Sequence, residues 1–215
     1  AVHQLVRSLY KPESDMWVRA TLYVVEGHWG EDTQADLVLT AYHQDKAAPV
    51  PIDIGVSSWQ RSGDVDLPPR IKTSANYQVA RLARIEGRGR GFKEMILLNR
   101  AGRVAEATGS CLLMVRNGQV ITTPAWEGRL ESITVEMVAV VCRSLGIEFL
   151  ERPIDRTELY LADELGLAGT LADLVAVRRI DDYELPAASP VLDKVRNRFW
   201  AAVRGTDPHP PSRTL

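Results

Sequence analysis

Residues 67–77 read Leu-Pro-Pro-Arg-Ile-Lys-Thr-Ser-Ala-Asn-Tyr, and they place one lysine, Lys72, between two prolines and a helix-like pattern. Each proline fixes its own φ, so the pair stiffens the connector. Apolar residues recur at helical spacing over residues 74–86, which predicts a helix leading out of this segment. Most loop lysines are simply solvated, whereas a lysine that forms a Schiff base needs a shielded site that lowers its pKa. The prolines, Ile71 and the following helix predict such a shielded setting for Lys72.

An acidic residue, Glu106, interrupts the apolar or small run Val104–Ala107 about thirty residues after Lys72. Its local pattern alone is that of an exposed strand residue. A carboxylate beside a pyridine nitrogen, however, keeps that nitrogen protonated, and the ring then withdraws electrons from a substrate Cα. Tyr77 is suited to hydrogen-bond the phenolic oxygen of such a ring, although alone it fits the core side of a helix. A lysine, a tyrosine and a distant acid are the groups that hold pyridoxal phosphate (PLP), and they predict amino-group transfer.

Two segments are candidates for binding phosphate, which requires backbone N–H groups at a helix start. Residues 130–134 open a predicted helix, and Ser132 and Thr134 add hydroxyl groups there. Simple N-capping explains the same pattern. Residues 167–172 follow a predicted strand and combine a glycine, which allows close approach, with the hydroxyl of Thr170.

The composition favours a small-molecule substrate. The chain has 215 residues, 45% of them hydrophobic, and a net charge of −2, so no broad basic field is expected to attract nucleic acid or a membrane surface. We expect a cytoplasmic protein, because no signal-peptide pattern and no apolar run of membrane-spanning length is present. Cys111 and Cys142 lie in apolar runs and are expected to be buried thiols, and the four histidines lack metal-ligand spacing.

Periodicity predicts the elements of an α+β fold. The expected strands are residues 17–25, 36–42, 52–60, 94–99, 104–107, 111–116, 119–122, 147–152, 164–169 and 174–180. The expected helices are residues 1–9, 74–86, 133–145, 156–162 and 190–203, with a loop over 27–32. Asn117-Gly118 is expected to form a tight hairpin turn, and the glycines of residues 87–91 to end the second helix.

Together these segments resemble a fold-type-IV PLP enzyme (D-amino acid aminotransferase-like), and most closely a branched-chain amino acid aminotransferase. Each segment alone is weak, but the ordered set is specific and covers nearly the whole chain. The residues that carry the resemblance are Trp17–Arg19, Val56–Arg61, Lys72 with Ala75–Tyr77, Glu106 with Gly109, Leu130–Thr134, Glu158–Glu164 and Gly169–Thr170. The departures from the family pattern are Trp17, Ala107, Cys111, Glu131, Ser132, Val135 and Leu171.

The resemblance implies a role for each matched residue. Lys72 would bind PLP covalently and move the Cα proton. Glu106 would pair with the pyridine nitrogen and Tyr77 with the phenolic oxygen. The phosphate would be held by Ile133, Thr134 and Thr170. The substrate would be contacted by Trp17, Arg19, Gly169, Thr170 and Leu171, with Arg19 facing the distal carboxylate of glutamate and residues 169–171 fixing the α-carboxylate.

The resemblance also implies a domain plan and a reaction. We expect an incomplete N-terminal domain over residues 1–60, a connector over 61–72, a C-terminal pseudo-barrel over 73–205 and a loose tail over 206–215. The implied protein is a homodimer without a metal that transfers an amino group between a branched-chain amino acid and 2-oxoglutarate. Other chemistries of the same fold stay open: D-amino acid or (R)-amine transamination, aminodeoxychorismate lyase activity, or an inactive truncated homologue acting as a binding partner.

Overall fold

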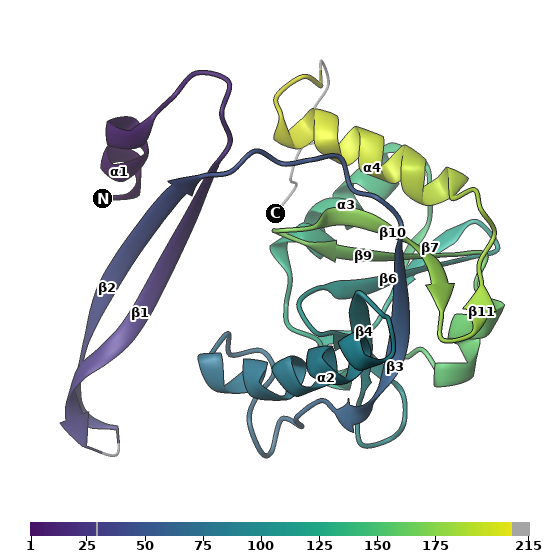
Figure 1. Cartoon of the computed structure of the whole chain (residues 1–215), viewed down its shortest axis with the longest axis horizontal. Coiled ribbons are helices and arrows are strands. Elements are labelled where there is room, and N and C mark those ends of the chain that lie inside the picture. Colours follow the sequence, from purple (N-terminus) through teal and green to yellow (C-terminus); the bar gives the residue numbers. More distant parts are fainter. Residues whose placement is uncertain (29, 208–215) are drawn as a thin grey trace. The chain divides into compact units, whose positions relative to one another are not determined.

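The computed structural model describes residues 1–28 and 30–207, which form two compact units, Ala1–Ala48 and the chain from Pro49 onward (Figure 1). The expected domain boundary at residue 60 differs from this division. Strand β3 (Ile52–Gln60) pairs with strands of the second unit, so it belongs to that unit. Most of the predicted tail, residues 206–215, lies outside the described residues.

The first unit consists of a short helix and a long hairpin. Helix α1 (Val2–Leu9) is followed by the antiparallel strands β1 (Met16–His28) and β2 (Glu31–His43), which pair from Met16↔His43 onward. Both strands are longer than expected, and the predicted loop over residues 27–32 shrinks accordingly; its Trp29 lies outside the described residues. Trp17 and Tyr42 are opposite each other on this hairpin, and their rings stack 6.2 Å apart.

A single mixed sheet forms the centre of the second unit. Among the described residues its strand order is β5-β4-β3-β10-β9-β6-β7-β8, with β11 added to β10. The remaining strands are β4 (Glu94–Leu98), β5 (Val104–Ala107), β6 (Cys111–Arg116), β7 (Gln119–Thr122), β8 (Phe149–Glu151), β9 (Glu164–Gly169), β10 (Asp173–Ile180) and β11 (Tyr183–Glu184). The two ends of this order approach each other, because Val104 N–H donates to the carbonyl of Ile154, just beyond β8, at 2.9 Å. The sheet therefore curls back on itself around an apolar centre that includes Ile96, Leu112 and Leu165.

Three helices within residues 49–207 pack on this sheet. They are α2 (Tyr77–Gly89), which follows the 3-10 turn η1 (Ser74–Asn76), α3 (Ile133–Ser144) and α4 (Pro190–Val203). Helices α3 and α4 share an apolar cluster with strands β6, β7, β9 and β10. Short 3-10 helices occur at η2 (Ala125–Glu127) and η3 (Arg156–Leu161). None of the helices within residues 1–28 and 30–207 is long and apolar enough to cross a membrane.

Helix α2 ends within the glycine-rich residues 87–91, as expected, but three residues later than the predicted limit of residue 86. The helix continues to Gly89. Gly87 is buried, and a Cβ there would lie 2.6 Å from the side chain of Met95 on β4. A glycine at this position thus serves close helix–sheet packing, a role that local sequence patterns do not distinguish from helix termination.

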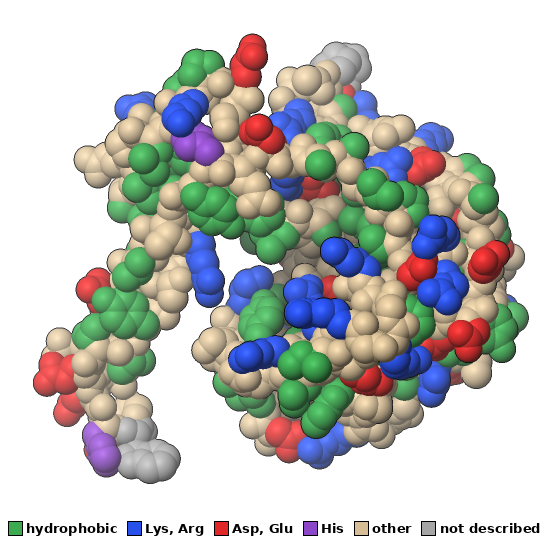
Figure 2. All heavy atoms as spheres, viewed as in Figure 1, with side chains coloured by type: hydrophobic (Ala, Val, Ile, Leu, Met, Phe, Trp, Pro, Cys, Tyr) green, Lys and Arg blue, Asp and Glu red, His purple; other side chains and the backbone are tan. Residues whose placement is uncertain are grey.

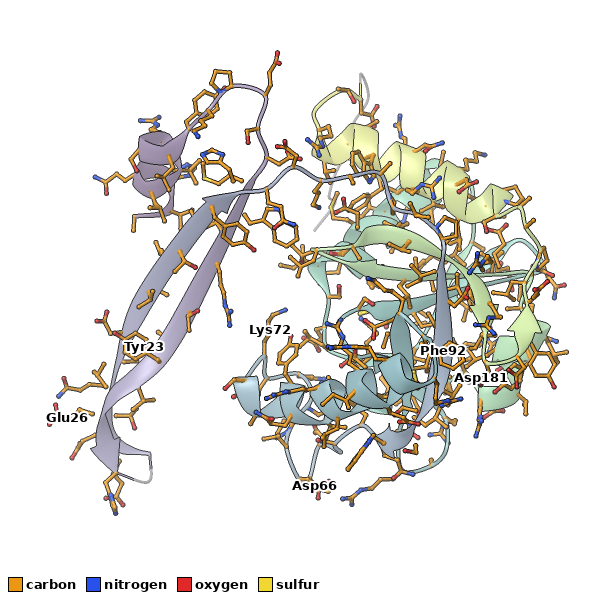
Figure 3. All side chains as sticks on the ribbon, in the orientation of Figure 1. Tyr23, Glu26, Asp66, Lys72, Phe92 and Asp181 are labelled. Atoms are coloured by element: carbon orange, nitrogen blue, oxygen red, sulfur yellow. The ribbon has the colours of Figure 1, made fainter. Side chains whose placement is uncertain are left out.

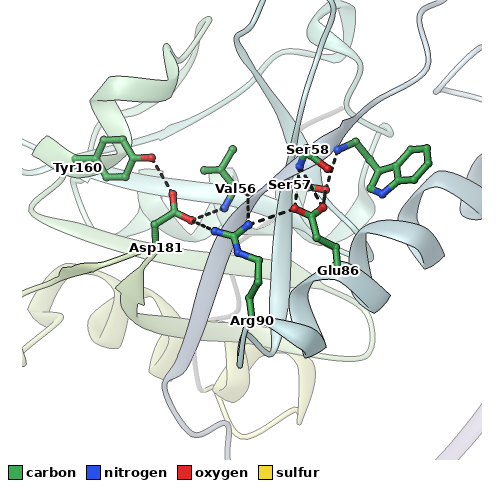
Figure 4. A network of polar contacts seen from close by, with 8 residues as sticks. Val56, Ser57, Ser58, Glu86, Arg90, Tyr160 and Asp181 are labelled. Atoms are coloured by element: carbon green, nitrogen blue, oxygen red, sulfur yellow. Dashed lines mark hydrogen bonds and ion pairs between the residues drawn. The ribbon is translucent and has the colours of Figure 1, made fainter.

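A polar network holds β3 between α2 and the turn after β10 (Figure 4). The Oδ1 atom of Asp181 accepts from Val56 N–H at 3.0 Å and from Arg90 at 3.2 Å. Arg90 in turn donates to the carbonyl of Val56 at 3.1 Å and to Glu86 at 3.3 Å. Glu86 also accepts from the Ser57 hydroxyl at 2.6 Å. These bonds fix the strand that leads directly into Arg61.

Candidate active site

Lys72 lies in the turn before α2, as expected, but its side chain is exposed (Figure 3). The expectation of a shielded lysine is wrong for the described chain. Ile71 is also exposed, so the apolar residue beside the lysine does not cover it. Asn76 anchors the segment instead: its Nδ2 donates to the carbonyls of Pro68 and Ile71 at 3.0 and 2.9 Å.

Tyr77 is the first residue of α2. Its side chain is 42% exposed, so it does not belong to the helix core, which was the alternative to a cofactor role. The position follows the anchored Asn76 directly and lies five residues from Lys72. The contact of Tyr77 with a cofactor stays a prediction.

Glu106 is buried, in contrast to the exposed strand residue that its local pattern favoured. Only 8% of the residue is exposed, and its Oε1 atom lies 2.9 Å from Nη2 of Arg61. Its Oε2 atom accepts from Leu130 N–H at 3.0 Å. Burial raises the pKa of Glu106, while Arg61, the Leu130 N–H group, Arg129 and Lys72 act to lower it. Lys72 is therefore close enough for its charge to act on this carboxylate.

The predicted phosphate segment begins α3. Ser132 is the N-cap, and its hydroxyl accepts from Val135 N–H at 3.3 Å, so the capping role expected for this residue is present. Thr134 is buried and Ile133 is exposed. The first-turn N–H groups of a helix lack partners within the helix and favour an anion. Arg70 of the lysine segment reaches this turn, where its Nε lies 3.3 Å from Glu131.

Cys111 lies near both Glu106 and the residues that precede α3. Its Sγ lies 3.9 Å from the carbonyl of Leu130, and burial raises the pKa of the thiol to about 11, aided by the charge of Glu106. The hydroxyl of Ser132 acts on the same thiol in the opposite direction. Both Cys111 and Cys142 are buried and free, as predicted.

The second candidate for binding phosphate, residues 167–172, includes the turn between β9 and β10. Gly169 is the last residue of β9, and the exposed Thr170 and Leu171 follow it. A Cβ on Gly169 would lie 3.2 Å from the Cβ of Ser110 and 3.4 Å from the carbonyl oxygen of Gly109. This turn is therefore packed against the segment that follows Glu106.

Trp17 and Arg19 belong to β1 of the first unit. Trp17 is anchored by its Nε1, which donates to the carbonyl of Gln44 at 3.0 Å, and Arg19 is opposite Thr40. Their contact with substrate stays a prediction.

Two positions that the sequence did not single out as site residues contribute to this region. Arg61 and Asn76 are both buried, and Arg61 Nη1 donates to the carbonyl of Asn76 at 3.1 Å. The sequence shows that Arg61 and Asn76 are polar and lie on either side of Lys72, but it does not show that their side chains are buried. Among the described residues, no group of three His, Cys, Asp or Glu side chains could hold a metal ion.

The model of a known family, "Amino-transferase class IV", matches residues 1–180. The chain belongs to the class IV aminotransferases. It is 40% identical over 153 residues to a probable branched-chain-amino-acid aminotransferase from Synechocystis sp., covering 71% of this chain and 50% of that protein. The chain spans about half the length of the curated relatives it matches.

Solved class IV structures share the fold. A branched-chain aminotransferase from Thermoproteus uzoniensis with norvaline superposes with a TM-score of 0.90 at 32% identity, over 96% of this chain and 70% of that one. The PLP form of a branched-chain amino acid aminotransferase from Thermobaculum terrenum gives 0.88 at 34% identity, over 96% and 69%. The expected α+β, fold-type-IV architecture is confirmed.

Proposed function

We propose that this chain is a PLP-dependent aminotransferase that moves an amino group between a branched-chain amino acid and 2-oxoglutarate. The observation that carries the proposal is the buried carboxylate of Glu106, 2.9 Å from Arg61 and within the electrostatic reach of Lys72. The similar proteins named as branched-chain aminotransferases, one solved with norvaline and one in its PLP form, support the substrate class and the cofactor.

The donor set fits PLP. Glu106 keeps a lone pair on each carboxylate oxygen after its two protein contacts, so it can still accept from a protonated ring nitrogen. The first turn of α3, with Thr134 beside it, suits a phosphate. Tyr77 opens α2 close to Lys72, where it would bond the phenolic oxygen. When bound, PLP supplies an electron sink for the bonds at the substrate Cα.

The residues of the chain would do the rest of the chemistry. The amine of Lys72 would take the proton from the substrate Cα and deliver it to the C4′ atom of PLP. Glu106 would hold the proton on the ring nitrogen. The turn after β9, through Gly169, Thr170 and Leu171, would orient the substrate α-carboxylate, and Thr170 would also contact phosphate. Trp17 and Arg19 would select the side chain and the distal carboxylate. We also propose that the protein is a homodimer and that it is located in the cytoplasm.

The first experiment tests cofactor attachment. Purified protein is mixed with PLP, scanned for the absorbance band of lysine-bound PLP, reduced with borohydride and digested for mass spectrometry. We expect a pyridoxyl group on Lys72, and none in Lys72→Ala. Lys93→Ala is the matched control, because Lys93 is also exposed on the same unit. If the wild-type chain shows neither the band nor the modified peptide, the chain is an inactive homologue.

The second experiment tests the reaction. A panel of L- and D-amino acids and (R)-amines is offered with 2-oxoglutarate, and glutamate formation is measured. We expect turnover with L-leucine, L-isoleucine and L-valine. Turnover with D-amino acids or (R)-amines alone would assign the chain to another activity of this fold, and pyruvate release from aminodeoxychorismate would assign it to the lyases.

A further inference from the structure

We propose that Arg61 is a positioning residue that joins the lysine segment to Glu106 and keeps the Glu106 carboxylate charged for the ring nitrogen of PLP. This inference rests on the proposed function and adds a residue to its machinery. Arg61 does not touch the reacting atoms itself; it acts through Glu106 and through the backbone beside Lys72.

The contacts of Arg61 reach three separate segments. Its Nη2 lies 2.9 Å from Oε1 of Glu106, and its Nη1 donates to the carbonyl of Asn76 at 3.1 Å. Its Nε donates to the carbonyl of Gly128 at 3.2 Å, in the loop that leads to α3. Only 6% of Arg61 is exposed. A planar guanidinium can hold three acceptors in fixed directions, which an ammonium group cannot do.

The position of Arg61 is itself determined by the fold. The residue directly follows β3, which the Asp181–Arg90–Glu86 network holds in register (Figure 4). Asn76, the acceptor of Nη1, clamps the turn that carries Lys72 through its side chain. A movement of Glu106 relative to Lys72 would therefore have to break bonds to Arg61.

Electrostatics gives the second reason. Burial raises the pKa of Glu106, and the nearest cation that opposes it is Arg61. Arg129 and Lys72 also oppose it, and Cys111 faces the same carboxylate as a neutral thiol. The nitrogens of Arg129 are committed to other acceptors, the carbonyls of Thr123 and Leu130 and the carboxylate of Glu151. Lys72 acts on Glu106 through its charge alone, and among the described residues no hydrogen bond or ion pair joins the two side chains. Arg61 is then the one directly bonded cation of Glu106 among the described residues.

A neutral Glu106 would not hold a proton on the ring nitrogen, and the ring would withdraw electrons less effectively. Loss of Arg61 should thus have two separable effects. The fold should lose stability because a buried carboxylate is left unpaired, and the ring nitrogen should lose its proton even where PLP remains bound.

The first test needs no cofactor. Unfolding is followed in urea for wild type, Arg61→Gln, Glu106→Gln and the double variant. We expect Arg61→Gln to be the least stable, the double variant to recover part of the loss, and the penalty of Arg61→Gln to grow as the pH rises from 5 to 8. The sign follows from the pKa of the unpaired, buried carboxyl, which is raised in the folded state. Above the pKa of the unfolded chain, the unfolded state gives up this proton more readily than the folded state does. Folding therefore becomes less favourable as the pH rises. Additive, pH-independent losses would remove the electrostatic link.

The second test uses PLP labelled with ¹⁵N in the ring. In the wild type we expect the chemical shift of a protonated ring nitrogen. In Arg61→Gln we expect the chemical shift of an unprotonated ring nitrogen and a kcat lower by about tenfold or more. In Arg61→Lys both quantities should return part of the way toward their wild-type values. The matched control is Arg103→Gln, because Arg103 pairs with the buried Glu127 at 2.7 Å and loses stability in the same way. The control should keep the protonated signal.

The outcomes separate the two proposals. A wild-type chain that binds no PLP overturns the proposed function, and with it the role toward the ring, while the unfolding series still measures the Arg61–Glu106 bond. A wild-type chain with a protonated ring and an Arg61→Gln variant with the same signal and the same kcat overturns the inference alone.

Discussion

A methyl group on Gly169 would lie 3.2 Å from the Cβ of Ser110, so the turn after β9 and the segment after Glu106 are packed at backbone distance. The φ of Gly169 is not in the left-handed region, and the demand for glycine is therefore one of space. This contact fixes the position of residues 169–171, which we propose bind the substrate carboxylate.

Gly169→Ala should displace that turn by a few tenths of an ångström and raise KM for the amino donor by about tenfold, with PLP still bound. Steady-state kinetics and the absorbance of bound PLP check both points. Gly89→Ala is the control, because a Cβ there meets open space and the helix should be unchanged or slightly more stable. An unchanged KM in Gly169→Ala would remove this turn from the substrate site.

Thr134→Val should weaken PLP binding by about tenfold, because it removes one hydroxyl from the start of α3 while keeping the shape of the side chain. Fluorescence titration with PLP measures the Kd. Thr157→Val, in an exposed position of η3, is the control. If the two variants bind PLP with equal affinity, the Thr134 hydroxyl does not contact the phosphate, and only backbone N–H groups at the start of α3 would bind it.

Glu86→Gln should cost about 1–2 kcal/mol of stability at pH 7. Burial alone would raise the pKa of Glu86, but bonds from Ser57 and Ser58 and the charge of Arg90 hold it below the ordinary 4.5. A lowered carboxyl pKa stabilises the fold above the unfolded pKa, and this contribution is lost as the pH falls through the folded value. Urea unfolding should therefore show the wild-type advantage shrinking below about pH 4.5. The exposed Glu184→Gln should show no comparable trend.

The two thiols should resist alkylation in the folded protein. Burial raises the pKa of Cys111 to about 11 and that of Cys142 to about 12. At pH 8 about one in a thousand Cys111 thiols and about one in ten thousand Cys142 thiols would be a thiolate, and access is also blocked. Iodoacetamide followed by mass spectrometry should find both unmodified in the native chain and both modified in urea. Fast labelling of Cys111 in the native protein would show that the start of β6, where Cys111 lies, becomes accessible to solvent.

Periodicity predicted the elements of this chain well where one face is buried and the other is not. The limits of α4 were predicted residue for residue, and those of α3 were predicted to within one residue. The expected Asn117-Gly118 turn is present, with φ values of 52° and 76°. The short β11 and the 3-10 turn η2 escaped prediction, because a two-residue strand and a three-residue turn carry no period.

Lys72 and Glu106 were chosen as candidates from the sequence, but the local pattern around each residue did not indicate its burial correctly. The lysine was expected to be shielded and is exposed, and the acid had a local pattern of exposure and is buried. Local sequence reports which side chains alternate, whereas burial depends on which distant segments cover them.

The sequence by itself determined the order of the longer elements and the resemblance to a family, and it made Lys72 and Glu106 candidates for cofactor binding, because each of these inferences rests on residue types at set spacings. Only the tertiary structure decided that Arg61 bonds Glu106, that Asn76 clamps the lysine turn, and that Gly169 packs on Ser110. Arg61 and Glu106, and Gly169 and Ser110, are far apart in the chain, and the curled sheet brings them together because its strands are paired out of sequence order. The Asn76 clamp is local, but it depends on the burial of Asn76, which the sequence does not show.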